Sequence, residues 1–133
     1  MHRRVMFFVD GENLVCRYQA MLAKGYQPLN GIDYEGDVFV WHSDIIRNTP
    51  RDIVRVTYYT SAVGDEDKVL SISERIKKVK YHFQGPPYGV GGRFGGSKSE
   101  QHYGYIFPCV FKKVNKSTRS RLVDINITID MLN

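Results

Sequence analysis

Apolar and polar positions at the start of the chain follow first a strand-like and then a helix-like pattern. Val5–Val9 is a continuous apolar run, as expected for a strand buried on both faces. From Glu12 onward the apolar residues recur at helical spacing, and Gly25 follows as a C-cap. The β-branched and aromatic residues of Ile53–Thr60 predict a second core strand. A strand, a sharp turn and an amphipathic helix are the opening of an α/β domain.

The middle of the chain predicts two successive strand–helix–strand units. Asp65–Lys78 predicts a second helix, with apolar side chains on one face and basic residues near its C-terminal end. Val79–Phe83 predicts a third strand, and right-handed crossovers would join the strands into a parallel sheet. Residues 26–52 are expected to form a connecting segment between core elements. Within it, Val38, Trp41 and Ile45 form an apolar patch that could be a short helix.

The remaining segments are less regular. Gly85–Gly96 is rich in glycine, and we expect a mobile insertion over residues 85–102. Tyr105–Val114 predicts another extended segment, in which Pro108 favours an edge strand or a bulge. Leu122–Leu132 alternates apolar and polar residues, so its periodicity alone predicts a strand.

Size and composition predict one ordinary globular domain spanning residues 1–133. A chain of 133 residues forms a single hydrophobic core, and 42% hydrophobic with 25% charged residues is enough to build it. The early apolar run is far shorter than a membrane span and no signal pattern precedes it, so we expect a soluble, cytoplasmic protein. Cys16 and Cys109 have no histidines at zinc-site spacing, which favours reduced, structural cysteines.

Charge is distributed unevenly along the chain, whose formal net charge is +5. Residues 1–74 contain 8 Lys/Arg against 11 Asp/Glu, whereas residues 75–121 contain 11 Lys/Arg and a single acidic residue, Glu100. Such a division suits an enzyme that gathers carboxylates around a metal and uses a cationic surface for a polyanion. A solvated, lysine-rich face explains the same distribution equally well.

Asp10 is the first candidate for chemistry because it lies where the first strand meets its helix. In an open parallel sheet the functional crevice lies at the carboxyl ends of the strands. Glu12 and Asn13 follow within one turn and add the hard oxygen atoms that Mg²⁺ and Mn²⁺ prefer. Asp10 would serve equally well as the N-cap of the helix, and its spacing leaves both roles open.

Basic and acidic residues of the last third supply further candidates. A basic run consists of Lys112, Lys113, Lys116, Arg119 and Arg121. These residues could contact phosphates or could simply be a solvated face. In a strand, Asp124 and Asp130 would lie roughly 20 Å apart. In a helix they would lie on different faces, so they are not equivalent ligands in either structure.

Four segments together resemble the NYN family, a branch of the PIN-like nucleases: Phe8–Leu14, Val56–Asp65, Pro108–Lys113 and Arg121–Leu132. The resemblance covers most of the chain, and the order and spacing of the segments make it specific. It implies a three-layer α/β/α sandwich around a mainly parallel sheet. It also implies a carboxylate cluster that binds Mg²⁺ or Mn²⁺ and cleaves RNA, expected to be single-stranded.

The resemblance assigns roles residue by residue. Asp10 resembles the family's first-strand aspartate, a metal ligand, and Asn13 the polar residue one turn later. Asp124 resembles the aspartate that opens a helix facing the metal site, which favours a helix over a strand for that segment, and Asp130 occupies a recurrent acidic position of lower rank. Metal-activated water would attack a phosphodiester while basic residues hold the flanking phosphates.

The sequence departs from the family pattern at its end. Similar proteins continue into a strand with a Ser-Gly-Asp-x-Asp type motif, whereas this sequence stops at Asn133. We therefore expect a fragment or a truncated domain, whose open apolar flank would invite pairing with another copy.

Three hypotheses about function follow. The first is a metal-dependent ribonuclease, and the second is a catalytically inactive PIN-like domain that binds RNA or a partner protein. The third is a phosphotransfer domain of the receiver or haloacid type, which is disfavoured because the haloacid pattern needs an aspartate where this chain has Glu12.

Overall fold

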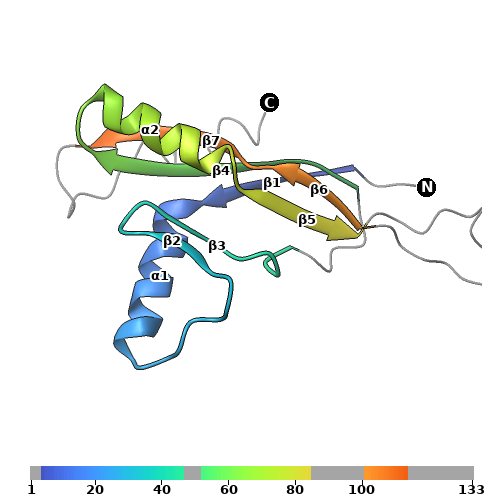
Figure 1. The fold of residues 1–133 in the computed structure, drawn as a ribbon, viewed down its shortest axis with the longest axis horizontal. Coiled ribbons are helices and arrows are strands. Elements are labelled where there is room, and N and C mark those ends of the chain that lie inside the picture. The colour runs from blue at the N-terminus through green and yellow to red at the C-terminus, as the bar shows by residue number, and fades with distance from the viewer. Residues whose placement is uncertain (1–3, 47–51, 85–100, 114–133) are drawn as a thin grey trace, which may run out of the picture.

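A computed structural model describes residues 4–46, 52–84 and 101–113, which form an α/β fold (Figure 1). Its centre is a three-stranded parallel sheet in the order β1-β4-β7. These strands are β1 (Arg4–Asp10), β4 (Asp52–Val63) and β7 (Phe107–Lys113). Two helices and two antiparallel strand pairs complete the described part: α1 (Gly11–Ala23), α2 (Glu66–Ile76), β2 (Asp33–Glu35) with β3 (Phe39–Trp41), and β5 (Lys80–Gln84) with β6 (Gln101–Tyr105).

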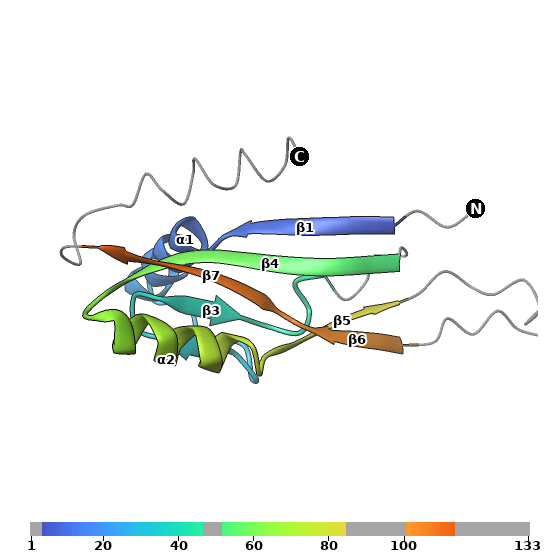
Figure 2. The ribbon, with the colours of Figure 1, turned by 90° about the horizontal axis from the view of Figure 1, so that it is seen from above.

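Strand β4 lies in the middle of the parallel sheet because its side chains are buried on both faces. Val56 and Tyr58 point to one face and Thr57 and Tyr59 to the other, and all four are at most 2% exposed. β1 pairs along one edge of β4, and β7 pairs along the other (Figure 2). The prediction that Ile53–Thr60 is a core strand is confirmed.

Both predicted helices are present and begin where their sequences favour an N-cap. The Asp10 side chain accepts a hydrogen bond from the Asn13 N–H at 3.1 Å, and Asp65 caps α2 through the Lys68 N–H at 2.9 Å. Gly25 follows α1 at a φ of +92°, a conformation that glycine adopts at low cost.

One hydrophobic cluster joins the sheet to the elements around it. Tyr58 lies at its centre, with its ring 4.8 Å from that of Phe39 and 6.4 Å from that of Trp41. Ile72 and Ile76 of α2 belong to the same cluster, and Leu14 of α1 packs against it. Tyr58 points to one face of β4, and residues of both described helices pack in or against the cluster that contains its ring. Both helices therefore contribute to the core on that face. The third layer of the expected sandwich stays a prediction.

The short helix predicted around Trp41 is wrong. The segment forms a hairpin, in which Val38 N–H bonds to the Glu35 carbonyl at 3.0 Å and Gly36 takes a φ of +46°. Phe39, Val40 and Trp41 are all buried, which suits an extended segment packed on both sides rather than one face of a helix.

The third predicted strand exists but does not join the parallel sheet. β5 pairs with β6, and the strand beside β4 is β7 instead. The burial pattern explains the error: Tyr81 and Phe83 are buried whereas Lys80 is exposed, which is the alternation of a one-faced ribbon. The extended segment predicted for residues 105–114 is confirmed up to Lys113, with Pro108 on a strand at the edge of the described sheet.

Several predictions fall on residues that the structure does not describe. They concern most of the insertion at residues 85–102 and the segment Leu122–Leu132. None of the described helices is long and apolar enough to cross a membrane.

Candidate active site at the carboxyl ends of the parallel strands

The parallel sheet brings three polar residues to one edge. Asp10 is the last residue of β1, Ser61 lies near the end of β4, and Lys113 is the last residue of β7. The register places Asp10 opposite Tyr59, two residues before Ser61, and Lys113 opposite Val63, two residues after Ser61, so the three strand ends are staggered along the sheet. This edge is where open α/β sheets bind their ligands.

Close packing beneath Asp10 sets the direction in which the chain leaves β1. A Cβ atom at Gly11 would lie 2.6 Å from the Tyr59 carbonyl oxygen and would also collide with the Tyr58 ring. Only glycine fits at this turn, since neither the backbone nor the buried ring can move away. The turn holds Asp10 in an extended conformation, with its carboxylate fixed on the Asn13 N–H.

The ring of Tyr58 packs against Gly11, the residue after Asp10. Its hydroxyl accepts a hydrogen bond from the Val40 N–H at 3.1 Å. Burial raises the pKa of Tyr58 far above its usual value of 10.0, the Val40 backbone lowers it in part, and the negative charge of Asp10 raises it further.

Glu12 is the second carboxylate at this edge, and it is only 7% exposed. Its Oε1 atom accepts a hydrogen bond from the Ser61 hydroxyl at 3.0 Å, a contact that joins residues 49 positions apart. Glu12 lies in the first turn of α1, where the helix dipole favours a negative charge. Removing a carboxylate from water is costly unless it is hydrogen-bonded, and the Ser61 hydroxyl offsets part of this cost for Glu12.

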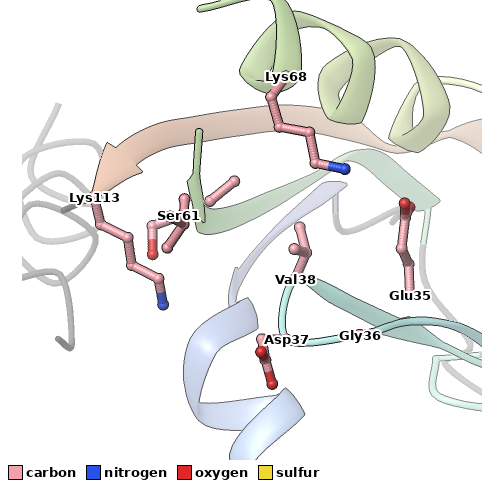
Figure 3. Close-up of a pocket in the computed structure, with 9 residues that line it drawn as sticks. Glu35, Gly36, Asp37, Val38, Ser61, Lys68 and Lys113 are labelled. Atoms are coloured by element: carbon pink, nitrogen blue, oxygen red, sulfur yellow. The ribbon is translucent and has the colours of Figure 1, made fainter. Parts of the chain in front are cut away.

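A pocket of about 230 Å³ opens beside Ser61, between the ends of β4 and β7 and the turn of the β2–β3 hairpin (Figure 3). Lys68 and Lys113 reach it from α2 and β7, and Asp37 and Glu35 line it from the hairpin. The volume is below the roughly 300 Å³ at which ordinary small-molecule pockets begin. The pocket has room for a phosphate-sized group rather than a whole nucleotide.

The acidic residues of the pocket are engaged, whereas its lysines are not. Glu35 pairs with the Arg75 guanidinium at 2.8 Å, and Asp37 accepts a hydrogen bond from the Gln19 side chain at 2.9 Å. Within the described ranges, neither Lys68 nor Lys113 forms an ion pair. The two ammonium groups are therefore available for an anion.

The structure places only some of the predicted site residues here. Asp10 lies at the site, while Asn13 contributes its backbone N–H and its side chain is exposed. Lys113 lines the pocket, but Lys112 is exposed and points to the other face of β7 because strand side chains alternate. The remaining predicted residues lie outside the described ranges: Lys116, Arg119, Arg121, Asp124 and Asp130.

The described part of the chain brings no three His, Cys, Asp or Glu side chains together in a metal-binding group. Sequence reasoning missed Ser61, Lys68 and Asp37. Ser61 had a usable signal, since it follows the predicted strand Ile53–Thr60 directly, as Asp10 follows Val5–Val9. Lys68 and Asp37 come from a helix and a hairpin whose positions the sequence does not specify.

Comparison with protein-family models, curated proteins and solved structures finds no match to this chain.

Proposed function

We propose that this chain is a metal-dependent ribonuclease domain of the PIN-like type, built as a three-layer α/β/α sandwich and acting on single-stranded RNA. The observation that carries the proposal is the pairing of two kinds of group at one sheet edge. Asp10 ends β1, and the Glu12 carboxylate accepts a hydrogen bond from Ser61, which lines a pocket whose lysines, Lys68 and Lys113, are available for phosphate. A phosphodiesterase needs both kinds of group.

The donor atoms fit a hard divalent cation. Mg²⁺ and Mn²⁺ take oxygen ligands, and Mg²⁺ is usually held by one or two carboxylates together with waters and substrate phosphate. Asp10 would hold the ion, with Glu12 beside it and Asp124 as a further ligand. A bound ion would activate water and neutralise charge on the phosphate.

The other residues have positioning and binding roles in this proposal. The Asn13 N–H holds the Asp10 carboxylate in one orientation, and Ser61 does the same for Glu12. Lys68 and Lys113 bind the phosphate that enters the pocket. Further phosphates contact other residues of the basic run, including Lys112 on the other face of β7. A cytoplasmic location is part of the proposal, and the free thiols of Cys16 and Cys109 are compatible with a reducing compartment.

The test is Mn²⁺-dependent cleavage of a single-stranded RNA by the wild-type chain and three variants. Asp10→Asn should abolish cleavage while the protein stays folded, because asparagine caps a helix about as well as aspartate. Asp124→Asn should have the same effect. Glu74→Gln, which removes an exposed carboxylate from α2 away from the pocket, is the control and should leave the rate unchanged. Full activity in both aspartate variants would refute the proposal.

A catalytically inactive PIN-like domain that binds RNA or a partner protein is the second candidate. It is favoured by the two available lysines at a site where the described residues supply no group of three metal-ligating side chains. It predicts that the chain retains RNA without turnover and that affinity falls steeply with salt. The cleavage assay separates the two candidates directly.

A further inference from the structure

A strip of exposed aromatic side chains lies at the opposite end of β7 from the pocket. Tyr103, Tyr105 and Phe107 alternate along β6 and into β7 and are 58%, 54% and 48% exposed. Between them, Ile106 is buried and Gly104 faces the Tyr81 ring. The three rings, here called the aromatic strip, alternate with these inward-facing residues and therefore lie on one side of the chain. The backbone of β6 continues almost directly into β7 (Figure 2).

Each ring of the aromatic strip has a cation against it. The Lys80 Nζ atom lies 4.6 Å from the centre of the Tyr103 ring and 5.9 Å from that of Tyr105. The Arg55 guanidinium lies 5.1 Å from the centre of the Phe107 ring. Neither cation forms an ion pair within the described residues, and β5 and β6 contain no acidic residue.

The inner face of the β5–β6 ribbon holds the strip in place. Tyr81 and Phe83 belong to the hydrophobic cluster, and the Ile106 N–H bonds to the Val79 carbonyl at 3.0 Å. A Cβ atom at Gly104 would lie 2.6 Å from Cζ of Tyr81, so this ring packs directly on the strand backbone. Rings held on such a support lose little freedom when a flat ligand stacks on them.

We propose that the aromatic strip, with Lys80 and Arg55, binds single-stranded RNA and directs it along β7 toward the pocket. Exposed aromatic rings next to cations that form no ion pair among the described residues match a polyanion that carries flat bases. The bases must be unstacked to reach the rings, which selects a single strand over a duplex. The choice of RNA rests on the proposed function, whereas the aromatic and basic surface itself does not.

The distance between the strip and the pocket suits one bound strand. Phe107 begins β7 and Lys113 ends it, so six residue steps of about 3.3 Å separate them by roughly 20 Å. RNA stacked on the strip can therefore present a phosphate several nucleotides away to Lys113 and Lys68.

The experiment measures binding without cleavage. A fluorescein-labelled single-stranded RNA of about 12 nucleotides, a length that covers typical single-strand sites, is titrated with the full chain in EDTA and followed by anisotropy. Replacing Tyr103 and Tyr105 together by alanine should raise Kd by roughly tenfold or more. Tyr26→Ala removes an equally exposed tyrosine from the loop after α1 and should leave Kd unchanged. Tyr103→Phe should also preserve binding, because the stacking face remains.

Salt dependence tests the cation separately. For single strands each phosphate contact contributes a slope of about −0.7 to the plot of log affinity against log salt. Lys80→Gln should reduce the magnitude of the slope by about this amount. An unchanged slope would remove Lys80 from the interface.

The remaining outcomes decide between this proposal and others. Wild-type affinity in the Tyr103→Ala, Tyr105→Ala double variant overturns the proposal, as does equal affinity for duplex RNA. The proposal is also overturned if the wild type binds no RNA but self-associates and the double variant does not self-associate. The aromatic strip would then be a contact between copies of the chain. If the wild type binds through the strip but cleaves nothing, the strip stands and the nuclease proposal fails. If the wild type cleaves RNA but the double variant binds RNA with unchanged affinity, the nuclease proposal stands and the RNA-binding role of the aromatic strip fails.

Discussion

Replacement of Asp10 separates its two roles, helix cap and metal ligand. Asp10→Ala removes the hydrogen bond to the Asn13 N–H and should lower the free energy of unfolding by about 1 kcal/mol. Asp10→Asn keeps a capping oxygen and should cost less than about 0.5 kcal/mol. Asp65 provides a matched control, because its side chain also accepts a hydrogen bond from the N–H three residues later and it carries no proposed metal role. Alanine and asparagine at position 65 should therefore change stability in the same order.

Added Mn²⁺ then distinguishes the two aspartates. An ion present at 100 times its Kd stabilises the folded protein by about 2.7 kcal/mol. We expect urea unfolding to show this gain for the wild type and for both Asp65 variants, and to show little of it for Asp10→Asn. An equal gain in Asp10→Asn would mean that Asp10 is a cap and not a ligand, and the proposed metal site would have to be abandoned.

Three further predictions concern groups around the site and the ribbon. Because the folded-state pKa of Tyr58 is raised, the unfolded chain loses this proton first above pH 10, so wild-type stability should fall by up to about 1.4 kcal/mol per pH unit there. Urea unfolding of Tyr58→Phe should lack that component, and parallel pH profiles of the two proteins would contradict the assignment. Ser61→Ala removes a hydrogen bond from the buried Glu12 carboxylate and should cost about 2 kcal/mol by the same measurement, whereas a cost near zero would show that Glu12 has another adequate donor. Gly104→Ala forces a Cβ into the Tyr81 ring and should cost about 1 to 3 kcal/mol, a loss that a second change, Tyr81→Leu, should partly reverse; additive losses would argue against a direct clash.

The boundaries of the elements near Asp10 were predictable because their signals are local. The cap at Asp10 joins atoms only three residues apart, and the cap at Asp65 does the same. The run Ile53–Thr60 is β-branched and aromatic over a strand length, and β4 covers it. Capping and strand propensity act within a few residues, so no knowledge of the rest of the fold is needed.

The partners of the strands were not predictable in the same way. Val79–Phe83 has the composition of a strand, but whether it extends the parallel sheet or forms a ribbon depends on which other segment offers its backbone groups. Here β6 does, and β7 takes the place beside β4. Polar and aromatic residues alternate over Lys80, Tyr81, His82 and Phe83. This alternation is typical of a strand with one buried face and differs from the continuous apolar run of Val5–Val9.

The sequence by itself therefore determined the α/β class, both helices, the central strand and the position of Asp10 at a strand end. Only the tertiary structure decided which side chains meet at the carboxyl ends of the strands. The Ser61–Glu12 hydrogen bond and the convergence of Lys68 with Lys113 join residues far apart in the chain. A strand's period of two specifies which side chains share a face but not which strand lies alongside, so such contacts follow from pairing and register across the whole domain.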